Sequence, residues 1–296
     1  MAARWYRALA AATLAFGLIL GNGQAARALV PYTYVPRNEA LEGAGLGLAQ
    51  AAARLLQMGQ AEDAARLAAL STQLLPNDPR SGVLLAEAQL RSKNSKEAAV
   101  ALARAKQLDP KNAGIWFAEG SLALRGNHPK QAIDLLRRGL DLDRNNAGAY
   151  FDLGNAQILL GQLTQALKSF ERAATLRKDF WEAVNNQSIV LYERGQTREA
   201  IQRWRQVLRL RPGAAEPTLA LAAALLANNA GAASEAISLA SRALDGDPNY
   251  VLPSFQQEQL WGPKLRAATA RLLTRSELRT VVERAQANAG SSKDEE

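Results

Sequence analysis

The sequence predicts an all-α fold, a right-handed α-solenoid of about six helix pairs with a C-terminal capping helical segment. One pattern recurs 34 residues apart, and it is clearest where Gly161 and Ala166 return as Gly195 and Ala200. Within each repeat the apolar residues fall at helical spacing in two runs, separated by a short polar stretch. Hydrophobic residues make up 48% of the chain but aromatic residues only 6%, which is typical of a helical array.

Small residues mark the places where the two helices of a pair are expected to approach each other. Gly154 and Ala166 stand at such positions, and a larger side chain there would force the backbones apart. Phe170, or Trp204 one repeat later, is predicted to fill the space towards the neighbouring repeat. Because a single helix pair cannot bury both of its faces, the pairs are expected to stack.

The chain begins with the parts of a secretory signal peptide. Arg4 and Arg7 precede an uncharged run, Ala8 to Gly21, and residues 26–28 have the form of a cleavage site. The run is shorter than the roughly 20 residues of a spanning helix. Residues 1–28 are therefore interpreted as a cleaved signal peptide or an uncleaved membrane anchor, with a buried core helix as the third alternative. Either of the first two places the repeats across the membrane from the basic N-terminus.

Residues 29–44 are predicted to form an extended, proline-containing arm. Pro31 and Pro36 bracket a short segment with two tyrosines, and two prolines so close together disfavour a helix. The arm is interpreted either as a strand that binds a partner or as a segment that packs on the first repeat.

The repeats are predicted to run in phase from residue 45 to 250. Their ranges are 45–78, 79–112, 113–146, 147–180, 181–214 and 215–250. The sixth repeat carries two extra residues around 227–232, in the turn between its helices, where an insertion costs little entropy. Prolines are predicted to end helices at Pro76, Pro110, Pro212 and Pro248.

Residues 251–288 are predicted to form capping helices that cover the last apolar face of the stack. Pro263 suits the start of one helix, and Thr274 with Glu277 forms a predicted capping box before the next. Residues 289–296 are predicted to be a disordered tail.

The repeated positions carry a resemblance to a known family. Leu153-Gly154, Ala166, Phe170 and Pro212 stand where the pattern W-x2-L-G-x2-Y, then A-x3-F, then P places them, so the chain resembles the tetratricopeptide repeat (TPR) family. The resemblance implies a non-catalytic scaffold that binds a protein or peptide in a concave groove lined by the first helix of each repeat. The groove residues that it implies are Leu90, Arg91, Phe117, Leu124, Arg125, Phe151, Asn155, Ile158, Asn185, Asn186, Ile189 and Tyr192.

Two pairs of groove residues have distinct expected roles. Phe117 and Phe151 are interpreted as anchors for apolar side chains of a peptide, or alternatively as residues that pack between repeats. Asn155 and Asn186 stand where relatives that clamp a carboxylate terminus place asparagines, but Phe151 occupies the position of a clamp lysine. The amides are therefore expected to hold a peptide backbone rather than a chain terminus.

Arginines give the fifth repeat a basic patch, Arg198, Arg205 and Arg209. The patch is interpreted as a surface for anionic lipid or an acidic protein, or alternatively as an ordinary solvated face. Nucleic acid is not expected as a partner, because aromatic residues do not alternate with the basic ones.

The sequence offers no catalytic constellation. His128, the single histidine, lies in a Gly-Asn-His-Pro turn, and the chain has no cysteine, which excludes disulfides and thiolate metal sites. No phosphate loop or zinc-protease motif occurs. Neither an enzyme activity nor a cofactor or metal is expected.

Two functions are compatible with these features. The first is an exported or membrane-associated adaptor that aids assembly of a membrane-associated complex. The second is a membrane-anchored partner that localises or regulates a biosynthetic enzyme. Residues 255–265, FQQEQLWGPKL, with the apolar leader, look like cyanobacterial and plastid repeat proteins tied to thylakoid membranes, some of which help photosystem or chlorophyll-enzyme assembly. That resemblance implies the periplasm, the thylakoid lumen or the thylakoid membrane.

Overall fold

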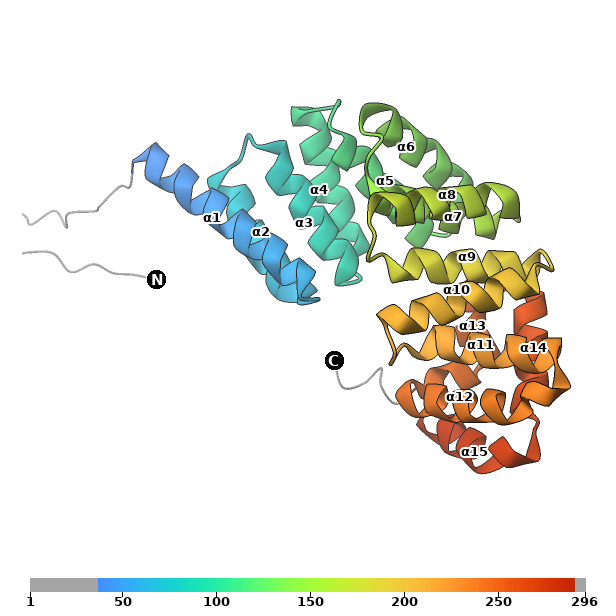
Figure 1. Cartoon of the computed structure of the whole chain (residues 1–296). Coiled ribbons are helices and arrows are strands. Elements are labelled where there is room, and N and C mark those ends of the chain that lie inside the picture. Colours follow the sequence, from blue (N-terminus) through green and yellow to red (C-terminus); the bar gives the residue numbers. More distant parts are fainter. Residues whose placement is uncertain (1–36, 291–296) are drawn as a thin grey trace, which may run out of the picture. The chain divides into compact units, whose positions relative to one another are not determined.

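Helices that follow one another in pairs make up nearly all of the described chain (Figure 1). The computed structural model describes residues 37–290. The predicted signal peptide or anchor, most of the predicted extended arm and residues 291–296 of the predicted tail lie outside that range. Within the described residues there are fifteen α-helices, three short 3-10 helices and no strand.

Six pairs come first. Their helices are α1 (Asn38–Gln57), α2 (Ala61–Leu74), α3 (Pro79–Arg91), α4 (Ser95–Leu108), α5 (Ala113–Arg125), α6 (Pro129–Leu142), α7 (Ala147–Leu159), α8 (Leu163–Leu176), α9 (Trp181–Glu193), α10 (Thr197–Leu210), α11 (Ala215–Asn228) and α12 (Ala233–Gly246). The short helix η1 (Ala230–Ala232) lies in the last of the turns, where the sequence has its two extra residues. The remaining elements are η2 (Pro248–Val251), α13 (Pro253–Glu258), α14 (Pro263–Leu273), η3 (Ser276–Leu278) and α15 (Arg279–Asn288).

The contacts between helices are those of a stack of pairs. The two helices of each pair pack against each other, and the second helix of one pair packs against the first helix of the next. The predicted all-α fold of stacked helix pairs is thereby confirmed. Helices α3, α5, α7, α9 and α11 begin at the residues where predicted repeats two to six begin.

Two features of the turns recur with the repeat. The side chains of Asp78, Asn112 and Asn146 accept hydrogen bonds from backbone N–H groups at the starts of α3, α5 and α7. Such caps satisfy donors that the first helical turn leaves without partners, so they fix where these helices begin. Within the pairs, the turns place a residue at positive φ every 34 residues, at Gly59, Lys93, Asn127, Gly161 and Gly195.

The first helix is longer than predicted. Because α1 begins at Asn38, residues 38–44 are helical, and the prediction that the extended arm reaches residue 44 is wrong. A proline restricts only its own backbone and that of the residue before it, so Pro31 and Pro36 do not prevent residues 38–44 from being helical. After them, Glu39 in the first turn favours a helix because its negative charge complements the helix dipole.

Close approach within a pair depends on small residues, as the contact of Gly154 in α7 shows. A Cβ atom at Gly154 would lie 2.5 Å from a ring carbon of Phe170, which is fully buried in α8. Phe170 thus fills the space against the first helix of its own pair, where its ring also contacts that of Phe151. It reaches the next pair through Gln187 of α9, whose side-chain amide donates to the Phe170 carbonyl. In the pair before, Gly120 and Leu136 make the equivalent contact.

We expect Gly154→Ala to lower the free energy of unfolding by about 1–3 kcal/mol, because the added methyl group must displace the Phe170 ring. Gly148, in the same helix, is the matched control, since a Cβ there meets only the side-chain oxygen of Asn146 at 3.4 Å. Gly148→Ala should be neutral or stabilising. Denaturant unfolding of both variants measures the difference, and equal stabilities would contradict this packing.

The C-terminal elements do not simply continue the stack. Helix α15 packs on α12, whereas α14 packs on α11 and α9, the first helices of the last two pairs. The predicted capping box is wrong. The Thr274 hydroxyl donates a hydrogen bond to the carbonyl of Arg271. The Glu277 carboxylate accepts hydrogen bonds from the side chains of Arg275 and Ser276. The local pattern missed this because the chain makes a 3-10 turn before α15 begins at Arg279.

Candidate functional site

A groove of about 1710 Å³ runs along the first helices of the pairs. Its lining comes from the end of α1, from α3, α5 and α7, and from the beginning of α9. Seven of the predicted groove residues line it: Leu90, Arg91, Phe117, Leu124, Arg125, Phe151 and Asn155.

The two phenylalanines have both of the roles considered for them. Each lines the groove and each is only partly buried. Yet the ring of Phe117 lies against Gly139 of α6, and the ring of Phe151 lies 5.7 Å from Phe170 and 5.0 Å from Phe180. One side of each ring therefore stabilises the contact between helices, and the rest faces the groove.

Charged side chains lie beside these rings. Arg91 pairs with Glu87 at 2.7 Å and also donates to the carbonyl of Leu56, so it ties α3 to the end of α1. Arg125 is exposed in the groove. Arginine side chains of this kind can hold carboxylates or carbonyl oxygens of a bound chain.

Asp152 is a groove residue that the sequence reasoning missed. Its carboxylate accepts a hydrogen bond from the Ser121 hydroxyl, 31 residues earlier. Burial raises the pKa of Asp152, whereas the Ser121 hydrogen bond and the charge of Arg125 act in the opposite direction. Helical spacing could have predicted this position. Asp152 precedes the predicted groove residue Asn155 by three positions, so the two side chains lie on the same face of α7.

The predicted asparagines are used by the fold itself. Asn186 donates to the side chain of Asn155 at 3.0 Å, and Asn185 accepts from the indole of Trp204 at 3.1 Å. Asn185 and Asn186 are both buried. The prediction that they line an open groove is therefore wrong; of the three amides, only that of Asn155 reaches the groove.

Ile158, Ile189 and Tyr192 do not line the groove either. Ile158 packs against the core around Phe170, while Ile189 and Tyr192 are buried in the large cluster at the C-terminal end of the stack. That cluster includes Leu265 and Leu272 of α14, so α14 covers the face that α9 and α11 would otherwise present to a ligand.

The start of α14 is fixed by Glu193, at the end of α9. The Glu193 carboxylate accepts hydrogen bonds from the backbone N–H groups of Lys264 at 3.2 Å and Leu265 at 2.8 Å. In return the Lys264 ammonium donates to the Glu193 carbonyl at 2.7 Å. One carboxylate thus caps α14, where the helix dipole favours negative charge, and one ammonium caps α9.

A second carboxylate, that of Glu216 in α11, holds the segment before α14. It accepts a hydrogen bond from the indole of Trp261 at 2.9 Å, and Trp261 is almost fully buried. Burial raises the pKa of Glu216 to about 7, against the opposing effect of hydrogen bonds from Trp261, Asn185 and Tyr250. The same desolvation also raises the pKa of Tyr250.

The chain's own C-terminal segment therefore sets the end of the groove. Gln257 and Glu258 of α13, together with Leu260, line the groove at this end. From Leu56 to Trp181 the groove is open, and beyond that point the first helices are covered by α14.

The predicted basic patch is exposed, on the second helix of the fifth pair. Arg205 pairs with Glu235 of α12 at 3.3 Å, with half of each side chain in solvent. Arg198 and Arg209 make no ion pair with any residue that the structure describes.

Within residues 37–290, no group of three or more potential ligands is arranged to hold a metal ion. His128 is exposed at the start of α6. None of the helices in that range has the length and apolar character needed to span a membrane.

Comparison with known proteins places this geometry in a family. Residues 117–179 and 185–251 match the tetratricopeptide repeat family model. No curated protein matches the chain. A thermophilic TPR protein of Thermus thermophilus has a TM-score of 0.54 at 21% identity, covering 62% of this chain and 100% of that chain.

Two further solved structures are similar. The pilF protein of Pseudomonas aeruginosa has a TM-score of 0.59 at 19% identity, covering 74% of this chain and 99% of that one. A chain of the APC/C hetero-tetramer Cut9-Hcn1 has a TM-score of 0.63 at 16% identity, covering 80% of this chain and 46% of that one. At these identities the solved structures show the fold alone. Residues 117–179 and 185–251 are therefore similar to tetratricopeptide repeats, and the stacked helix pairs from α1 to α12 share the fold of these repeats.

Proposed function

We propose that this chain is a non-catalytic TPR scaffold that holds an extended segment of a client protein in the open groove from Leu56 to Trp181. The observation that carries the proposal is that this groove is open and lined by both apolar and charged side chains, while the chain itself covers the face beyond it. TPR helix pairs serve protein and peptide binding, which supports this assignment.

The size of the groove favours a polypeptide over a small molecule. Small-molecule sites usually enclose about 300–1,000 Å³ and bury most of their ligand. The groove here measures about 1710 Å³ and is lined by residues of five first helices, α1, α3, α5, α7 and α9. Phe117 and Phe151 offer apolar contact to client side chains, and Arg91, Arg125 and Asn155 offer hydrogen bonds to its backbone or its carboxylates.

We further propose that the scaffold acts in the export pathway or at a membrane, where it aids assembly of a membrane-associated complex. The support is the leader, in which Arg4 and Arg7 precede an uncharged run ending at Gly21. An alkaline phosphatase fusion at Ala289 tests this location. Phosphatase activity is expected, and an inactive fusion would contradict export of the repeats.

A photosynthetic complex is the narrower form of this proposal. It rests on the resemblance of residues 255–265 to thylakoid-associated repeat proteins. Within this chain Trp261 of that segment packs on Glu216, so the segment also has a role in closing the stack. Co-fractionation with thylakoid membranes is expected under this form, and recovery of the protein only elsewhere would exclude it.

Reversing two charges in the groove tests the proposed function. The double variant Arg91→Glu/Arg125→Glu is expected to lose at least tenfold in recovery of clients from the source cells, because the client loses two charge-assisted contacts. Both side chains are exposed enough that the fold should be retained. Affinity purification with quantitative mass spectrometry measures the loss.

Lys130→Glu/Arg137→Glu is the matched control. Both residues are exposed on α6, a second helix, and neither lines the groove. The control should recover the wild-type set of clients. If both double variants recover that set equally, the groove is not where clients bind.

A further inference from the structure

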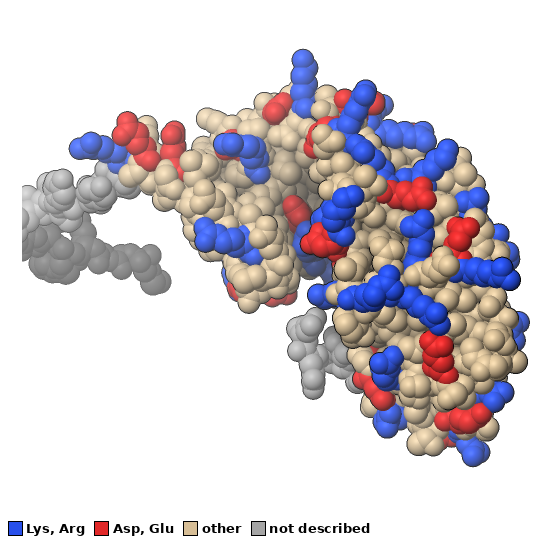
Figure 2. All heavy atoms as spheres, viewed as in Figure 1, with Lys and Arg blue, Asp and Glu red and all other residues tan. Residues whose placement is uncertain are grey.

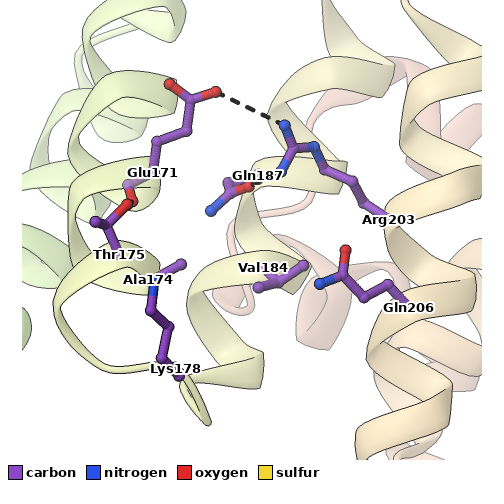
Figure 3. A pocket seen from close by; sticks show the side chains of 8 residues that line it. All are labelled: Glu171, Ala174, Thr175, Lys178, Val184, Gln187, Arg203 and Gln206. Atoms are coloured by element: carbon purple, nitrogen blue, oxygen red, sulfur yellow. Dashed lines mark hydrogen bonds and ion pairs between the residues drawn. The ribbon is translucent and has the colours of Figure 1, made fainter.

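A second recess lies between neighbouring pairs, away from the groove. It has a volume of about 280 Å³, it is open to solvent and lined by residues of α8, α9, α10 and the turn after α8, and it shares no lining residue with the groove (Figure 3). Glu171 and Thr175 of α8 line one side, Arg203 and Gln206 of α10 line the other, and Gln187 of α9 lies between them.

A buried amide positions the arginine of this recess. Gln187 is 1% exposed, and its amide nitrogen donates to the Phe170 carbonyl at 3.1 Å. Its side-chain oxygen is thereby turned towards Arg203, from which it accepts a hydrogen bond. The guanidinium is therefore held in one orientation by a group that is itself fixed in the core, which lowers the entropy cost of binding a ligand there.

Arg203 retains capacity to bind an anion. A guanidinium has five N–H donors, and the recorded contacts of Arg203 engage its two terminal nitrogens, with the Glu171 carboxylate as far away as 3.8 Å. Lys178, which lines the recess between α8 and α9, is exposed and makes no ion pair with a described residue. Two cations thus face one loosely held carboxylate.

The surroundings reinforce this positive charge. Helix α10 carries four arginines and a single glutamate. In the space-filling view, Lys and Arg side chains gather over α8 and α10, with fewer Asp and Glu among them (Figure 2). Such a field attracts a negatively charged segment and speeds its association.

We propose that this recess is a docking site for an acidic segment of a partner protein, with one Asp or Glu side chain inserted between Lys178 and Arg203. The incoming carboxylate displaces Glu171 from Arg203 and accepts hydrogen bonds from the guanidinium and from the amide of Gln206. The site lies beyond the proposed function, because it engages the second helices rather than the groove, and both sites can be occupied together.

A protein segment fits better than an anionic membrane surface. The recess holds one side chain at a time, with fixed amide and hydroxyl groups around it. Glu171, Glu199 and Glu235 interrupt the positive charge around α10, whereas attraction to a lipid surface depends on closely clustered cations. The charge pattern therefore matches discrete carboxylates.

A labelled peptide of alternating glutamate and alanine is the test probe, with an alternating glutamine and alanine peptide as its neutral control. Fluorescence anisotropy at low salt is expected to show binding of the acidic peptide only. Lys178→Gln and Arg203→Gln should each weaken binding about tenfold. Lys178 is exposed in a turn, so its substitution keeps the fold even where that of Arg203 perturbs packing.

The sharpest variant is Glu171→Gln, because it removes the carboxylate that competes for Arg203. It should tighten binding about two- to fivefold, whereas Lys130→Gln on α6 should leave it unchanged. In NMR titrations the side-chain amide signals of Gln187 and Gln206 should shift with the peptide.

Three results would overturn the proposal. The first is that Lys130→Gln weakens binding of the acidic peptide as much as Lys178→Gln does, which would indicate nonspecific electrostatic attraction. The second is that Glu171→Gln binds the acidic peptide no more tightly than the wild-type protein does. The third is binding to phosphatidylserine vesicles with none to the peptide. Because the groove variant Arg91→Glu/Arg125→Glu should bind the peptide normally, failure of this site is distinguishable from failure of the groove.

Discussion

Replacing Trp204 with alanine is expected to lower the free energy of unfolding by about 3–5 kcal/mol. Trp204 is fully buried between α9 and α10, with its ring 5.9 Å from that of Tyr192. Its indole also donates to Asn185, and truncation would leave that buried amide oxygen without a donor. Denaturant unfolding followed by far-UV circular dichroism measures the change.

Trp116→Ala is the control for this prediction. Trp116 is only partly buried, on α5, where Lys106 lies 4.2 Å from its ring centre. Trp116→Ala should lower the free energy of unfolding by less than half as much as Trp204→Ala does. Similar denaturation midpoints for the two variants would mean that Trp204 does not hold α9 and α10 together.

Stability is expected to fall as the pH rises from about 4.5 to about 7 because of Glu216. Its pKa in the folded chain is about 7, raised above the ordinary 4.5 by burial. A carboxyl group with a raised pKa binds its proton more tightly when folded, so its contribution is fully present below pH 4.5 and is lost as the pH passes 7. The contribution is on the order of 3 kcal/mol.

Glu216→Gln isolates this effect. The amide oxygen can still accept the indole hydrogen bond of Trp261, but the side chain no longer titrates. All other groups titrate alike in both proteins, so the difference between their unfolding free energies reports Glu216 alone. That difference should change by about 3 kcal/mol between pH 4.5 and 8. A constant difference would show that the carboxylate is not desolvated.

The fold could be predicted from short-range pattern. Small residues are needed where the two helices of a pair approach closely, so these positions recur with the repeat. The alanines at them are fully buried: Ala52, Ala64, Ala86, Ala98, Ala132, Ala166, Ala200, Ala222 and Ala236. The 34-residue recurrence of these small residues is therefore enough to predict paired helices. The resemblance to the TPR family, rather than the periodicity itself, implied that Leu90, Phe117, Phe151 and their neighbours line a groove.

The end of the groove could not be predicted, because it depends on contacts far apart in the sequence. Trp261 reaches Glu216 across 45 positions, and Leu265 reaches Glu193 across 72. No repeat pattern extends to residues 251–288, so nothing in the sequence says on which face α14 packs. For that reason Ile189 and Tyr192 occupy groove positions in the family pattern but lie beneath α14 in this chain.

The central claim is that a client binds along α3, α5 and α7, and that α14 occupies the corresponding face of α9 and α11. Hydrogen exchange with mass spectrometry, on the protein alone and with a client recovered by affinity purification, tests it most directly. The account predicts added protection in peptides from Val83–Arg91, Phe117–Arg125 and Phe151–Leu159, with α14 protected in both states. Added protection confined to α4, α6 and α8, or rapid exchange of α14 in the free protein, would contradict it.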